Sequence, residues 1–102
     1  MSAAITVNSR QGVPIRLTEE RWAHIVVGHG ELAGLREEIL RAILMPERIL
    51  AGNGGELLAM RGQSDGKTLV VVYREFTDDG FIITAFLTGR SRSLERRKQL
   101  WP

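Results

Sequence analysis

The first half of the chain carries apolar residues at the spacing of a helix face. A first helix is predicted over residues 18–27, with Thr18 as its N-cap. Two acidic residues follow Thr18, and acids are favoured near a helix N-terminus by the helix dipole. Gly28 is a typical stop signal for this helix. The apolar stripe has the i, i+3, i+4 pattern and consists of Trp22, Ile25 and Val26.

A second amphipathic helix is predicted over residues 31–44. It is expected to end before Pro46, because the residue that precedes a proline avoids the helical region of backbone conformation. Its narrow apolar stripe consists of Leu32, Leu35, Ile39 and Ile43.

The second half of the chain alternates strand-like runs with glycine-rich turns. Segment 77–80 is predicted to join the last two strands as a hairpin, and a short helix is predicted over 93–100. Helices followed by a strand meander predict an α+β fold, with two N-terminal helices on one face of a three- to four-stranded antiparallel sheet and a short C-terminal helix. The predicted strands are 48–51, 56–61, 68–76 and 81–88.

The predicted hairpin loop implies a register for the two strands that it joins. Phe76 would face Phe81, and Tyr73 would face Thr84 on the same side of the sheet, since directly opposite residues share a face. The opposite face is more apolar and is therefore expected to receive the helices, which leaves Tyr73 and Thr84 on the floor of a cleft. The more apolar face comprises Val70, Val72, Phe76, Phe81, Ile83, Ala85 and Leu87.

The length and composition are those of one globular domain. The chain has 102 residues and no cysteine, which excludes disulfides and thiolate metal sites. Residues 1–14 are expected to form an irregular or strand-like lead, and residues 15–102 the domain. The N-terminal segment lacks a basic start and a long apolar run, and no apolar stretch reaches membrane-spanning length. We therefore expect a cytoplasmic protein without membrane contact.

Basic residues are concentrated near the C-terminus. Five of the 14 basic residues lie within residues 90–98, beside a single acid there, Glu95. Such a segment indicates attraction to RNA or another polyanion, and the alternative is a solvated helix end whose cations favour the helix dipole. The candidate RNA-binding residues are Arg90, Arg92, Arg96, Arg97 and Lys98.

The two histidines of the chain, His24 and His29, lie in one short segment, with Glu31 just beyond. Histidine has the unperturbed pKa that allows proton transfer near neutral pH. His24 lies about 200° from Trp22 on a helical wheel, which favours a general base or acid, although a boundary histidine bonded to a backbone carbonyl is the alternative. The spacing of five residues separates the two rings on a helix surface, so no metal site is predicted. A helix cap and a catalytic role are equally open for His29.

Three residues of the strands complete the candidate site. The Tyr73 phenol and the Thr84 hydroxyl would orient a phosphate or a ribose hydroxyl, or they form an ordinary cross-strand pair. The Arg61 guanidinium would stabilise a pentavalent phosphate, or it is a solvated strand arginine.

Several segments, taken together, resemble short bacterial proteins. These proteins are similar to the phage-associated branch of the barnase–EndoU–colicin–RelE-like ribonuclease superfamily. The resemblance covers about residues 15–100 and is carried by segments 15–18, 22–25, 28–31, 46–49, 69–72 and 80–86.

The resemblance implies metal-independent RNA cleavage without a cofactor, often in toxin modules. The 2′-hydroxyl would attack the adjacent phosphate and leave a 2′,3′-cyclic end. The family's helix histidine falls on His24 and its strand hydroxyl on Thr84, whereas Arg61 is a looser match. His29 or Tyr73 would be the counterpart of His24 in proton transfer. The implied partners are RNA and, for a toxin, an antitoxin protein.

A non-catalytic module that binds RNA or protein is the alternative function, and an exposed hairpin edge could form a homodimer by strand pairing. The structural test between the two functions is whether His24, Tyr73 and Thr84 line one cleft, as is expected of the ribonuclease. A small-molecule enzyme has little support, because the glycines at 52–55 precede a strand rather than a helix.

Overall fold

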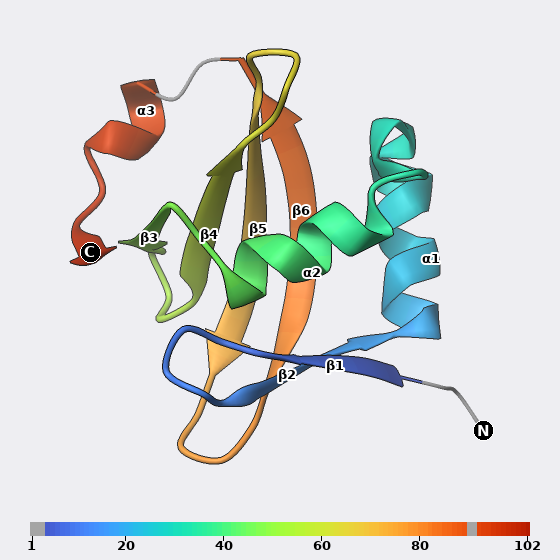
Figure 1. Ribbon diagram of the computed structural model, residues 1–102, viewed down its shortest axis with the longest axis horizontal. Coiled ribbons are helices and arrows are strands. Elements are labelled where there is room, and N and C mark those ends of the chain that lie inside the picture. Colours follow the sequence, from blue (N-terminus) through green and yellow to red (C-terminus); the bar gives the residue numbers. More distant parts are fainter. Residues whose placement is uncertain (1–3, 90–91) are drawn as a thin grey trace.

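A computed structural model describes residues 4–89 and 92–102 as a mixed seven-stranded sheet with helices packed against it (Figure 1). Within these residues, the helical segments are α1 (Glu19–Gly28), the 3-10 helix η1 (Gly30–Leu32), α2 (Arg36–Leu44) and α3 (Arg92–Glu95). In sheet order, the strands are β1 (Ala4–Asn8), β2 (Pro14–Thr18), β6 (Gly80–Thr88), β5 (Thr68–Glu75), β4 (Leu57–Gly62), β3 (Arg48–Ala51) and β7 (Gln99–Trp101).

The predicted fold class is wrong, although most of the predicted elements exist. The strands β1 and β2 precede α1, and β2 pairs with β6 in parallel through Ile15↔Gly80 and Arg16↔Phe81. The sheet is therefore mixed and nearly twice as wide as the predicted antiparallel meander. This parallel pairing joins residues far apart along the chain, and local periodicity carries no record of such a contact.

The helix predictions hold in part. Thr18 caps α1 by accepting a hydrogen bond from the Arg21 N–H (3.0 Å), as the sequence predicts. The second predicted helix is interrupted, because η1 ends at Leu32 and α2 begins only at Arg36. The predicted C-terminal helix is four residues long and is followed by β7, which pairs with β3.

The predicted register of the β5–β6 hairpin is also wrong. The loop is 76–79 rather than 77–80, so Glu75 lies opposite Gly80. The register then shifts between Val72 and Tyr73, which places Tyr73 opposite Ile82 and Val72 opposite Thr84. Such a bulge adds one residue to a strand and reverses the faces of all residues beyond it.

The helices α1 and α2 cover the face of Leu69, Val71 and Tyr73, which was expected to be open. Tyr73 and Ile82 are fully buried in the core beneath these helices, together with Ile25 and Ile43. A smaller cluster occupies the opposite face beneath α3 and contains Leu50, Leu58, Met60, Val70 and Leu94.

Candidate functional site

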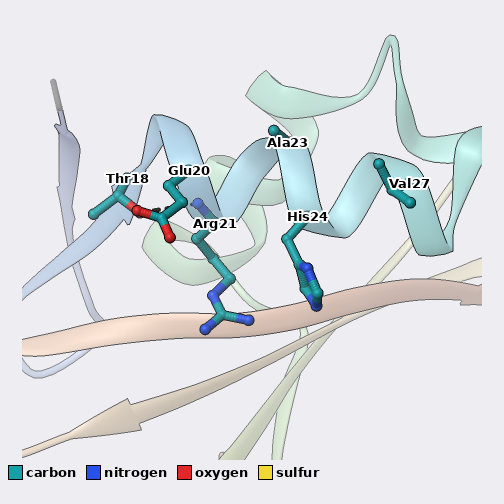
Figure 2. A pocket seen from close by; sticks show the side chains of 6 residues that line it. All are labelled: Thr18, Glu20, Arg21, Ala23, His24 and Val27. Carbon is teal, nitrogen blue, oxygen red and sulfur yellow. Dashed lines mark hydrogen bonds between the residues drawn. The ribbon is translucent and has the colours of Figure 1, made fainter.

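The outward side of α1 carries two exposed side chains that point the same way. Arg21 and His24 are one helical turn apart, a spacing at which side chains are neighbours on a helix surface. Both side chains point toward β6 (Figure 2). They line an open hollow of about 640 Å³ together with Thr18, Glu20, Ala23 and Val27. Ile25 is buried against the core, whereas Arg21 and His24 are exposed.

His29 lies at the end of α1, where its ring contacts β6. Its backbone N–H donates to the Ile25 carbonyl and caps the helix. Its ring centroid lies 6.5 Å from that of Phe86. The Nδ1 atom lies 3.3 Å from Oε1 of Glu31, and the His29 side chain is 40% exposed. A carboxylate at one ring nitrogen determines which nitrogen carries the proton, and it leaves Nε2 available for proton transfer. The cap and the catalytic role are thus compatible.

The contact between His29 and Phe86 also places Thr84 relative to His24. Helix α1 packs alongside β6 and runs in the same direction (Figure 1). The five residues from His24 to His29 span about 7.5 Å of helix, and the two residues from Thr84 to Phe86 span about 6.6 Å of strand. His24 and half-buried Thr84 therefore lie at a similar height along β6, but Thr84 belongs to the sheet face of Val72 and Phe86, opposite the face that α1 and α2 cover. We call Arg21, His24, His29, Thr84 and Phe86 the α1–β6 site.

Tyr73 is not part of the α1–β6 site. It is 1% exposed and belongs to the core beneath the helices, on the opposite face of the sheet from Thr84. Burial, with a smaller effect from the charge of Glu75, raises the pKa of the Tyr73 phenol well above its ordinary value. A phenol in this position cannot transfer protons to a substrate at the surface, so the prediction of a shared cleft for Tyr73 and Thr84 is wrong.

Arg61 has a structural contact instead of a place in the site. Its guanidinium donates a hydrogen bond to the carbonyl of Met45 (2.7 Å), at the C-cap of α2. This bond ties β4 to the end of α2, because the last carbonyls of a helix lack partners within the helix.

Arg21 is the site residue that the sequence reasoning missed. The signal was its i, i+3 spacing from His24, which predicts two neighbouring side chains on one helix face. Within residues 4–89 and 92–102, neither the Arg21 guanidinium nor the His24 ring has a hydrogen-bond or ion-pair partner. Both groups are therefore free to contact a ligand.

The C-terminal basic residues form a separate hollow at the other side of the sheet. Arg96, Arg97 and Lys98 line an open space of about 460 Å³ with Asn53 and neighbouring residues. The Arg97 guanidinium donates to Asn53 Oδ1 (2.8 Å) and to the Ala51 carbonyl (3.4 Å). Four strand intervals separate β6 from β7, which is about 19 Å. Arg92 begins α3, and Arg90 lies outside the described residues.

Comparisons of the chain with protein-family models, with curated proteins and with solved structures found no match. In the described parts of the chain, no helix is long and apolar enough to span a membrane. The same residues contain no group of three or more His, Cys, Asp or Glu side chains placed to hold a metal ion. The chemistry of the α1–β6 site must therefore be argued from its own side chains.

Proposed function

We propose that this protein is a small metal-independent endoribonuclease whose reaction takes place at the α1–β6 site. The observation that carries the proposal is the exposed pair of Arg21 and His24, whose side chains have no partner among the residues that the structure describes. A proton-transfer group and a cation that stabilises developing negative charge are groups by which a protein accelerates phosphodiester cleavage. The proposal extends the resemblance to the barnase–EndoU–colicin–RelE-like superfamily, with His24 and Thr84 in the implied roles.

The reaction uses a nucleophile that RNA already contains. His24 accepts the proton of the ribose 2′-hydroxyl, and the 2′-oxygen attacks the adjacent phosphorus. The bond to the 5′-oxygen breaks, and His29, with both ring nitrogens protonated, donates its Nε2 proton to that leaving oxygen. The products are a 2′,3′-cyclic phosphate and a 5′-hydroxyl. A positioned acid or base of this kind contributes about 10²–10⁴-fold to the rate.

Arg21 and Thr84 serve the phosphate itself. The Arg21 guanidinium has the role that was predicted for Arg61. It binds the non-bridging oxygens of the phosphate through its planar fork of donors. The Thr84 hydroxyl donates a further hydrogen bond as negative charge develops on these oxygens. His29 replaces Tyr73 as the second proton-transfer group, since its ring is exposed and oriented by Glu31.

RNA is the proposed substrate, in a cytoplasmic setting, and an antitoxin protein is the partner proposed for a toxin-like module. The basic hollow of Arg96, Arg97 and Lys98 attracts the phosphate backbone without regard to sequence. Because it lies about 19 Å from β6, it acts only on RNA long enough to reach both places. Substitution of Arg97 is therefore expected to weaken cleavage of long RNA more than that of short RNA.

The test is cleavage of a mixed single-stranded RNA in EDTA by the wild type, His24→Ala and Arg21→Ala. Val27→Ala is the matched control, because Val27 lines the same hollow one turn further along α1 and is 86% exposed. We expect cyclic phosphate ends by mass spectrometry, a rate reduced about 100-fold or more by His24→Ala, and an unchanged rate for Val27→Ala. Absence of cleavage by folded wild type, or equal cleavage by His24→Ala, would refute the proposal.

A non-catalytic RNA-binding module is the second candidate, and the fixed position of Arg97 favours it. In that case, RNA is bound but left intact by the wild type, binding is unchanged in His24→Ala, and it is lost when Arg96, Arg97 and Lys98 are replaced together by alanine. Binding measured by fluorescence anisotropy at two salt concentrations distinguishes the two functions.

A further inference from the structure

Strand β1 forms an outer edge of the sheet, whereas β5 of the β5–β6 hairpin lies inside it. Strand β5 is paired on both sides, and β6 is paired with β5 and, at its start, with β2. Dimerisation through the hairpin edge, expected from the sequence, is therefore excluded along β5. Among the described residues, β1 and β7 are the two outer strands of the sheet.

Strand β1 lacks the charged side chains, prolines and bulges that keep many edges from pairing with another chain, and α2 packs against it from the helix side of the sheet. Natural edge strands are protected by charged side chains, proline, bulges or short length. The β1 residues Ala4–Asn8 carry no charge and no proline, and their pairing with β2 is regular over all five positions. In contrast, β7 has three residues, and Pro102 follows it directly. The unpaired edge of β1 can accept a further strand, whereas β7 is poorly suited to this.

The residues of β1 are complementary to a second copy of themselves. Ile5 and Val7 lie opposite buried Leu17 and Ile15, so both face the helix side of the sheet. If two β1 strands pair antiparallel with Thr6 opposite Thr6, all five residues of each strand find a partner. Ile5 then lies opposite Val7 of the second copy. Apolar pairs and Thr–Thr pairs are both favourable between antiparallel strands.

We propose that β1 is a homodimer interface, in which the β1 strands of two copies pair antiparallel about a two-fold axis at Thr6. A two-fold interface requires a self-complementary surface, and β1 provides one. The pairing joins the two sheets into one and covers Ile5, which is 38% exposed in the single chain. The proposal does not depend on RNA cleavage.

Cross-linking tests the register directly, because the chain contains no native cysteine. In the proposed dimer, the two Thr6 Cα atoms lie about 4.5–5.5 Å apart, within the range of about 4.4–6.8 Å that a disulfide bridges. Oxidised Thr6→Cys is expected to form a covalent dimer on a non-reducing gel. Arg16→Cys is the matched control, because Arg16 is the exposed partner of Thr6 on β2. Three strand intervals, about 14 Å, separate the two copies of residue 16 and prevent its cross-linking.

Sedimentation velocity over a concentration series measures the dimer itself. Thr6→Lys places two like charges opposite each other and is expected to raise the dimer Kd about fivefold. Ser64→Lys adds the same charge in an exposed loop and should leave the Kd unchanged. A wild type that stays monomeric at all concentrations overturns the proposal. So does a dimer that Thr6→Lys does not weaken, or equal cross-linking of Thr6→Cys and Arg16→Cys.

Discussion

Replacing Gly80 with alanine tests the parallel contact that the sequence did not reveal. Gly80 is buried at the start of β6, where it lies opposite Ile15 of β2 and Glu75 of β5. A Cβ atom on Gly80 would lie 2.6 Å from Cδ1 of Ile15, and it would overlap still more closely with the carbonyl oxygen of Arg74. Both contacts are far inside van der Waals distance, so either the strands or the side chain must move.

The size of the effect follows from which neighbours can move. Ile15 can change its rotamer, but the Arg74 carbonyl belongs to the backbone of a paired strand. Overpacking of a core costs about 1–3 kcal/mol, and a rigid neighbour places Gly80→Ala in the upper part of that range. About 0.4–1 kcal/mol of this loss is offset, because alanine restricts the conformations of the unfolded chain more than glycine does. The net loss is about 2 kcal/mol, equivalent to a Tm lower by about 8–16 °C for a domain of this size.

Thermal unfolding followed by circular dichroism is the appropriate assay, with Gly28→Ala as the matched control. Gly28 is the last residue of α1, and a Cβ atom there meets nothing within 4 Å. Alanine is a better helix former than glycine, so Gly28→Ala should leave the Tm unchanged or raise it slightly. If Gly80→Ala unfolds within about 2 °C of Gly28→Ala, the close approach of β2, β5 and β6 at Gly80 is not present in solution and the reasoning fails.

Two further predictions concern side chains outside the α1–β6 site. The Gly54 N–H donated to Glu56, together with the nearby Arg74 charge, holds the pKa of the Glu56 carboxyl below its ordinary value. The ionised carboxylate therefore stabilises the fold above the ordinary carboxyl pKa of about 4.3, and this contribution is lost as the pH falls through the lower pKa of the folded state. The stability difference between wild type and Glu56→Gln in urea should be largest at neutral pH and shrink below about pH 4; a constant difference would contradict this account. Arg61→Ala should lower the free energy of unfolding by about 1 kcal/mol through loss of the bond to the Met45 carbonyl, while RNA cleavage per folded molecule stays unchanged. If folded Arg61→Ala no longer cleaves RNA, Arg61 belongs to the catalytic site and this account of it is wrong.

The elements of the fold were largely predictable, because each depends on nearby residues. The cap at Thr18 and the apolar stripe of α1 occur within ten residues, and the four strands of the second half follow from apolar runs between turns, of which β5 and β6 are rich in β-branched residues. The faces of these strands were not predictable. The irregularity in β6 between Ile82 and Thr84 placed Thr84 on the other face from Tyr73, and the helices pack on the face of Leu69, Val71 and Tyr73, which buries Tyr73 in the core.

The candidate site was predictable on the helix and less so on the sheet. His24 follows from its position off the apolar stripe, and Arg21 could have been found one turn earlier by the same criterion. Thr84 stays a predicted site residue, but its predicted neighbour Tyr73 is wrong, because Thr84 lies opposite Val72. Arg61 was chosen for the chemistry of its side chain, which says nothing about the Met45 carbonyl that holds it.

The sequence by itself determined where the helices and most strands form, that no disulfide exists, and that His24 faces away from the core. These properties depend on residue type and on spacings of a few residues. Tertiary structure alone decided the seven-stranded order, the parallel pairing of β2 with β6, the burial of Tyr73 and the exposed β1 edge. Each of these depends on contacts between segments distant in the chain, and their energy comes from packing and pairing that no local pattern contains.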